Sequence, residues 1–208
     1  MTSKTSNENG SLFNVLPEEK AKRRDEVTQW LLGVMNTMNM TSKRVITYCS
    51  TIRLFDYLYS TGQVKDEQMK IAICACLSIN LKLHDSMYME DMGEYIQHLT
   101  KNCCKWQEIV KTEMNIITSK QVKRLDMPSA AGLYMLSLQS ESALFSDLDL
   151  HDDICHLLQD RAMKYEFFDA NPLEEFMNLY RALKSQYNIP IPIEVVQDVM
   201  ESCMSQYT

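Results

Sequence analysis

The sequence predicts an all-α fold. Only five glycines and five prolines occur in 208 residues, so the chain is poor in the residues that make the tight turns of sheet proteins. Apolar residues recur instead at intervals of three and four along most of the chain, which is typical of helices that bury one face. With 45% hydrophobic and 24% charged residues, the chain is long enough to bury a substantial core.

The first two helices are expected on either side of residue 40. Pro17 is followed by two glutamates, an arrangement typical of a first helical turn. Apolar side chains then recur at helical spacing: Val27, Trp30, Leu31, Val34, Met35 and Met38. Thr41 and Ser42 are suited to cap a second helix, which should end at the turn formed by residues 60–62.

The third helix, from about Asp66 to Leu83, is apolar on nearly every side. Such a helix is surrounded by others, so we expect it at the centre of a bundle, with Asp66 as its cap. Lys82 stands near its end and has two interpretations. Its long stem can carry the charge to solvent from a buried helix, or the charge can meet a partner, and spacing alone favours the first.

The remaining helices fall into two series. Two shorter helices are expected at residues 89–99 and 105–117, after which Pro128 interrupts the pattern. A second series follows at residues 129–138, 148–167, 172–183 and 192–204. The two halves share a rhythm of helix lengths and little identity of letters, so we expect two comparable helical units.

Composition excludes several classes of partner and location. The net charge is −7 and no long basic run occurs, which argues against a nucleic-acid partner. We find neither an apolar segment long enough to cross a membrane nor a secretion signal. The seven cysteines have no framework-like spacing, as expected for reduced thiols in the nucleus or cytoplasm.

Motifs for catalysis are missing from the sequence. There is no glycine-rich phosphate loop, zinc-protease motif or nucleophile elbow, so we expect neither enzyme activity nor a cofactor. Cys74 and Cys76 would point about 200° apart on a helix and could not share a metal. Cys103 and Cys104, with His98 nearby, supply too few ligands without a distant partner. We therefore predict no metal site and interpret these cysteines as small buried residues.

Four charged residues stand on four of the expected helices: Arg24, Asp56, Lys82 and Glu113. Arg24 lies six residues before Trp30 in RRDEVTQWLLGV, Asp56 lies within RLFDYLYS, and Lys82 ends the apolar helix. In this order and at these spacings the residues resemble the cyclin family.

The resemblance extends over about residues 24–138. Ile71 matches a leucine of the family eleven residues before the lysine, and Pro128-Ser129 follows Glu113 where cyclins tend to have Pro-Thr. It implies the cyclin fold, with two repeats of about five helices each and a second repeat that is reduced. The expected divisions are a flexible head (1–16), a first cyclin-box repeat (17–126) and a more divergent second repeat (127–208).

The resemblance also implies roles for individual residues. Arg24 and Asp56 would form a structural ion pair, while Trp30 and Ile71 would be core anchors. Lys82 and Glu113 would contact a cyclin-dependent protein kinase around its αC helix.

The whole chain would then be a regulatory subunit that activates the kinase in cell-cycle or transcription control, by keeping the Lys–Glu ion pair of the kinase together. An alternative stays open, a cyclin-fold scaffold or adaptor that binds a non-kinase protein.

One family feature is absent from the sequence. Many cell-cycle cyclins carry a Met-Arg-Ala-Ile-Leu segment that docks substrates, and the corresponding stretch here has Arg23 and Glu26 in place of the methionine and isoleucine. An apolar docking patch of that kind is therefore not expected.

Overall fold

Helices are the only regular elements in the part of the chain that the computed structural model describes, which comprises residues 14–37, 42–84, 89–122, 125, 129–140, 148–165, 168 and 170–205. The all-α prediction is confirmed. Predictions about residues 1–13, about Thr41 as a cap and about Pro128 fall outside these residues. The elements are α1 (Glu18–Asn36), α2 (Ser42–Ser60), a 3-10 turn (Asp66–Gln68), α3 (Met69–His84), α4 (Met89–Leu99), α5 (Trp106–Thr118), α6 (Ala130–Ser140), α7 (Leu148–Met163), α8 (Pro172–Gln186) and α9 (Ile193–Ser205).

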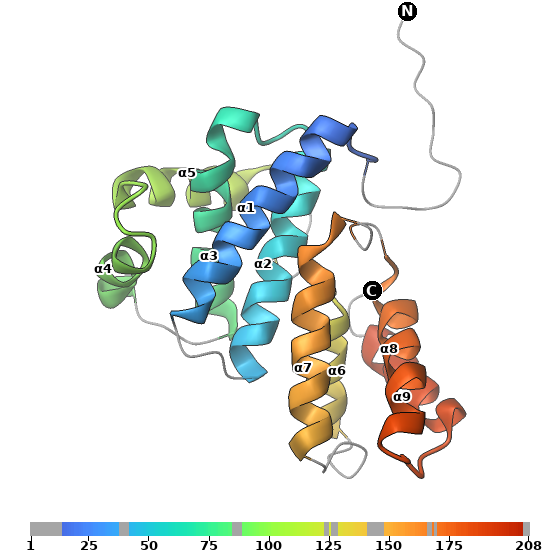
Figure 1. The fold of residues 1–208 in the computed structure, drawn as a ribbon. Helices are drawn as coiled ribbons and strands as arrows, with labels where there is room; N and C mark the ends of the chain where they lie inside the picture. The colour runs from blue at the N-terminus through green and yellow to red at the C-terminus, as the bar shows by residue number, and fades with distance from the viewer. Residues whose placement is uncertain are drawn as a thin grey trace, which may run out of the picture.

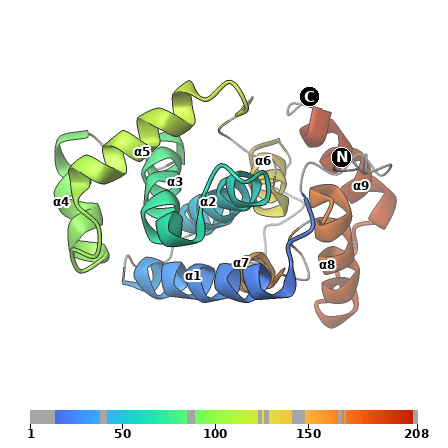
Figure 2. The ribbon, with the colours of Figure 1, turned by 90° about the horizontal axis from the view of Figure 1, so that it is seen from above.

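The apolar helix α3 lies at the centre of the first five helices, as its sequence predicts. Seen from above, α1 and α5 lie on opposite sides of α3, while α2 and α4 flank it (Figure 2). Every residue from Ala72 to Leu81 is buried, because neighbouring helices surround this stretch. Lys82 and His84 follow it in the last turn, where a cation also complements the helix dipole.

The start of α3 differs from the prediction. Asp66 does not cap this helix, because it opens a 3-10 turn and α3 begins three residues later at Met69. Its carboxylate accepts a hydrogen bond from the Tyr59 hydroxyl at 2.8 Å and forms an ion pair with Arg23. The aspartate therefore joins α1 to the end of α2. A local capping pattern contains no information about these contacts with other helices.

The second half packs along one side of α2. Helices α6 and α7 lie against α2, and α8 and α9 lie beyond them (Figure 1). The described residues of this half form four α-helices, compared with five in the first half. Helix α8 begins with Asn171, whose side chain accepts from the Leu173 amide at 2.9 Å, and Pro172 occupies its first turn.

Two arginines of the first half bind backbone carbonyls of the second. Arg24 donates to the carbonyl oxygen of Ala162 at 2.9 Å and to that of Met163, at the end of α7. Arg53 donates to the carbonyls of Phe168 and Ala170 at 2.7 and 3.0 Å. The last carbonyls of a helix have no partner within it, so Arg24 supplies hydrogen bonds to two such groups at the end of α7.

Candidate functional site

Lys82 and Glu113 meet between α3 and α5. The Lys82 ammonium forms an ion pair with Oε1 of Glu113, and the Ser78 hydroxyl donates to Oε2 at 2.9 Å. Ser78 lies four residues before Lys82, so both side chains project from the same face of α3. Both oxygens of the carboxylate are thus bound by a single face of the central helix.

The two members of this pair are unequally buried. The side chain of Lys82 is 23% exposed and that of Glu113 only 7% exposed. The charge of Lys82 therefore reaches the surface along its stem, while the carboxylate lies beneath it. In this arrangement Glu113 holds Lys82 in place, and Lys82 is the more accessible member of the pair.

Apolar side chains are exposed on the same two helices. Leu83 follows Lys82 and is 49% exposed, Met114 follows Glu113 and is 53% exposed, and Ile117 lies one turn further along α5 at 45%. These three make up half of the six large hydrophobic side chains that are exposed among the described residues. Exposed apolar groups on the two helices that carry a partly exposed charged pair are a feature of many protein-binding surfaces.

Arg24 and Asp56 form a second ion pair, in the interior. Two parallel hydrogen bonds join them, from Arg24 Nε to Oδ1 at 3.0 Å and from Nη2 to Oδ2 at 2.8 Å. Their side chains are 1% and 2% exposed. Since the remaining donors of Arg24 reach Ala162, Met163 and Asp25, the buried guanidinium is well supplied with acceptors.

Burial and the attraction between the two groups act in opposite directions on the charges of this pair. Burial disfavours the charged guanidinium, but the attraction and hydrogen bonds of Asp56 and Asp25 together outweigh it and raise the pKa of Arg24 above its ordinary value. For the Asp56 carboxyl, burial raises the pKa and the neighbouring Arg24 opposes the rise. Each group thus depends on the other to remain charged away from water.

Comparison with protein families places the chain in a family. The family model for the cyclin N-terminal domain matches residues 2–121, more than half of the chain. The protein belongs to the cyclin family. Comparison with curated proteins and with solved structures gave no significant match. The matched region of this cyclin contains all four charged residues of the two ion pairs.

Trp30 and Ile71, expected as core anchors, lie at the edge of the core of this cyclin. Both side chains are partly buried and pack against buried residues. The Lys70 ammonium lies 5.7 Å from the centre of the Trp30 ring, a cation–π contact between α3 and α1. Ile71 also lines a surface pocket between the turn after α2 and helix α5, together with Leu58 and Ile116.

Sequence reasoning missed one cluster in this cyclin. The sulfur atoms of Cys74, Cys103 and Cys104 all lie within 4.8 Å of one another. Cys74 and Cys104 are buried, as expected of small core residues, but Cys103 is exposed. The distant partner that Cys103 and Cys104 lacked is Cys74, which no local pattern could reveal because α4 intervenes in the chain.

No helix among the described residues is both long and apolar enough to span a membrane.

Proposed function

We propose that this cyclin is the regulatory subunit of a heterodimer with a cyclin-dependent protein kinase, and that it acts in cell-cycle or transcription control in the nucleus or cytoplasm. The observation that carries the proposal is the partly exposed ion pair of Lys82 with Glu113, on the same two helices as the exposed side chains of Leu83, Met114 and Ile117. These five residues are called the α3–α5 surface below. Family membership supports the proposal, because cyclins generally pair with kinases.

Lys82 supplies the polar contact in this proposal. An ammonium group carries three donors, so Lys82 keeps hydrogen-bonding capacity while it binds Glu113. These donors reach backbone carbonyls or side-chain oxygens near the αC helix of the kinase. Leu83, Met114 and Ile117 bury apolar area in the same contact, which contributes most of the affinity.

The cyclin itself contributes no catalytic group in this mechanism. Its binding energy stabilises the kinase conformation in which the Lys–Glu ion pair of the kinase is formed and the activation loop is ordered. The kinase population shifts only by the difference in cyclin affinity between its active and inactive conformations. Activation is therefore allosteric. Its extent depends on how much more surface the cyclin and the kinase bury together when αC is in its active position than when αC is in its inactive position.

Charge exchange across the Lys82–Glu113 pair tests the proposal. Glu113→Lys alone should destabilise the fold, because it places two ammonium groups together at a largely buried position. The double variant Lys82→Glu/Glu113→Lys restores an ion pair with the charges exchanged, so we expect it to fold. It should nevertheless fail to capture the kinase, because a carboxylate now faces the partner.

The experiment is capture from extracts of the source cell, with mass spectrometry of the bound proteins and an assay of kinase activity. Lys111→Glu is the matched control, since it makes the same change at an exposed position of α5. The wild type, the double variant and Lys111→Glu are compared after equal helix content and thermal stability have been verified. Recovery of no kinase by the wild type, or of equal amounts by the wild type and the double variant, would contradict the proposal.

The adaptor alternative predicts a different result. A cyclin-fold scaffold would capture a non-kinase protein, and that capture would persist in the charge-exchanged double variant. Kinase activity in the captured material would then be absent from every sample.

A further inference from the structure

Three thiols from distant parts of the chain meet on the face of α3 away from Cys76. Cys74 comes from the middle of α3, while Cys103 and Cys104 lie in the turn that leads into α5. All three sulfur atoms lie within 4.8 Å of one another, and those of Cys103 and Cys104 are 3.6 Å apart. We call these residues the thiol cluster.

The backbone before Cys103 has an uncommon conformation that directs the two cysteines toward α3. Lys101 and Asn102 follow α4 with φ of 50° and 56°, in the left-handed region that residues other than glycine seldom adopt. The turn is held by hydrogen bonds from the Asn102 amide to the Gln97 carbonyl at 2.8 Å and from the Cys103 amide to the Thr100 carbonyl at 3.1 Å. Such strained backbone persists only where the surrounding structure supports it.

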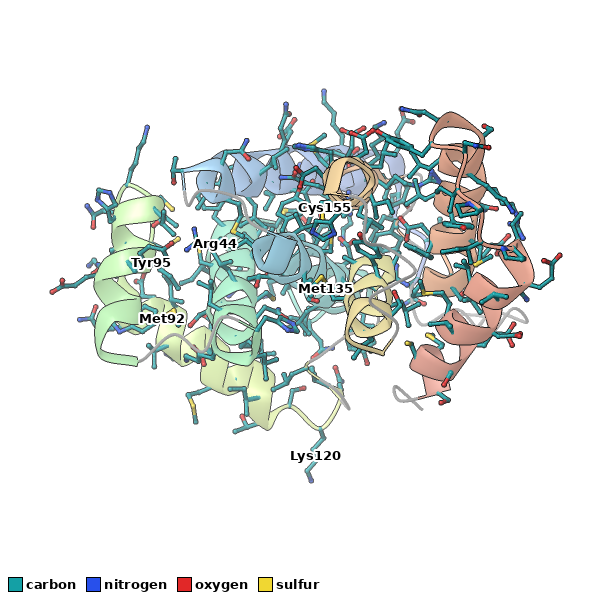
Figure 3. All side chains as sticks on the ribbon, turned by 90° about the horizontal axis from the view of Figure 1, so that it is seen from below. Arg44, Met92, Tyr95, Lys120, Met135 and Cys155 are labelled. Carbon is teal, nitrogen blue, oxygen red and sulfur yellow. The ribbon has the colours of Figure 1, made fainter. Side chains whose placement is uncertain are left out.

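Close packing of α4 on α5 supports this turn. A Cβ atom at Gly93 would lie 2.9 Å from Nε1 of Trp106, so only glycine allows α4 to approach the first residue of α5 this closely. Met92 and Tyr95 lie on the side of α4 that faces the other helices (Figure 3), and Met92 is fully buried. The turn that carries two of the thiols is therefore held by packing at both ends.

The spacing of the sulfur atoms matches a metal site. At the usual Zn–S bond length of about 2.3 Å, sulfur ligands lie about 3.8 Å apart in a tetrahedral site and about 4.0 Å apart in a trigonal one. The distances in the cluster fall within about 1 Å of these values. Thiolates are soft ligands, which favour Cu⁺ and Zn²⁺ over Mg²⁺ or Ca²⁺.

We propose that Cys74, Cys103 and Cys104 form a binding site for a thiophilic d¹⁰ cation, either Cu⁺ held by three thiolates or Zn²⁺ with solvent as a fourth ligand. Cys74 is fully buried, Cys104 is 9% exposed and Cys103 is exposed, so the cation enters and binds further ligands on the Cys103 side. Binding fixes the start of α5 to α3. The proposal does not depend on the proposed kinase binding.

Metal titration of the 208-residue protein tests this site. The protein is purified in reduced form, freed of metal, and titrated anaerobically with Zn²⁺ alone or with Cu⁺ alone against a chromophoric chelator. We expect one cation per chain by native mass spectrometry, in one arm or both, with three sulfur neighbours by X-ray absorption. Cys103→Ser and Cys74→Ala should each weaken metal binding by roughly 10-fold or more. Removal of an outer-shell partner of a metal ligand already costs roughly that factor, and these variants remove a ligand itself.

Cys76→Ala is the matched control. It removes a fully buried thiol from the same helix, two residues from Cys74 and on the opposite side, so the metal affinity should not change. Cys103 is exposed, so Cys103→Ser should fold even if Cys74→Ala proves unstable. The site is excluded if neither cation competes with the chelator at one equivalent, or if Cys103→Ser binds the metal as tightly as the wild type.

Discussion

The two ion pairs of the first five helices have the same chemistry and different surroundings. Arg24–Asp56 joins α1 to α2, and its side chains are 1% and 2% exposed, whereas Lys82–Glu113 joins α3 to α5 with the lysine 23% exposed. Every part of the first pair contacts protein, and the second lies at the surface beside exposed apolar side chains. The comparison indicates that burial and neighbours, more than charge, separate a structural pair from one available to a partner.

Loss of Arg24 should have the largest effect on stability. Arg24→Met removes the donor that binds the buried Asp56 carboxylate and the carbonyl of Ala162, and one of the two donors to the carbonyl of Met163. We expect the free energy of unfolding to fall by about 3–5 kcal/mol, as for other broken buried pairs. Denaturant unfolding measures the change. Arg23→Met is the control, and its effect should be smaller because the ion pairs of this neighbouring arginine are solvent-exposed.

If Arg24→Met and Arg23→Met proved equally stable, the Arg24–Asp56 pair would not have the structural role that its burial indicates.

Removal of the Glu113 charge should have an intermediate effect. Glu113→Gln keeps an oxygen that can accept from Ser78 or Lys82 but weakens both hydrogen bonds. A lost hydrogen bond to a charged group typically costs about 1.5–3 kcal/mol, so we expect a decrease in that range. The same unfolding experiment measures it. A decrease larger than that of Arg24→Met would reverse the order that exposure predicts for the two pairs.

The smallest effect on stability should come from the exposed apolar residues. Leu83→Ser and Met114→Ser alter side chains that are about half exposed, so stability should change by no more than about 0.5 kcal/mol. Kinase capture should still fall severalfold, because these residues belong to the α3–α5 surface. Val195→Ser, at a residue on α9 that is 44% exposed, is the control and should leave capture unchanged. If all three variants captured equal amounts of kinase, the proposal that Leu83 and Met114 contribute to the contact would be contradicted.

The helices were largely predictable from the sequence because apolar periodicity is a local property. α4 matches its expected bounds, and the other helices begin or end within a few residues of theirs. The largest difference is the end of α7, expected at residue 167 and found at Met163. Arg24 binds the carbonyls of residues 162 and 163 there, a contact from a distant helix that local periodicity does not contain.

The candidate site was predictable only in part. Resemblance to cyclins identified Lys82 and Glu113, but no local pattern indicated that the carboxylate would be buried beneath the lysine, since that depends on how α5 packs on α3. Asp66 was predicted to cap α3 because an aspartate before an apolar run has the same local pattern whether it caps the helix or, as here, opens a 3-10 turn. The thiol cluster was missed because it depends on the path of the chain through α4.

The contact of Arg24 with the end of α7 also bears on the order of folding. It joins residues 138 positions apart, so the chain must close a long loop before the contact forms. Loop closure of this length is slow compared with helix formation, which is local. We therefore expect α1 to complete its packing late, after α7 has formed, so that the first helix in the sequence is among the last to reach its final position.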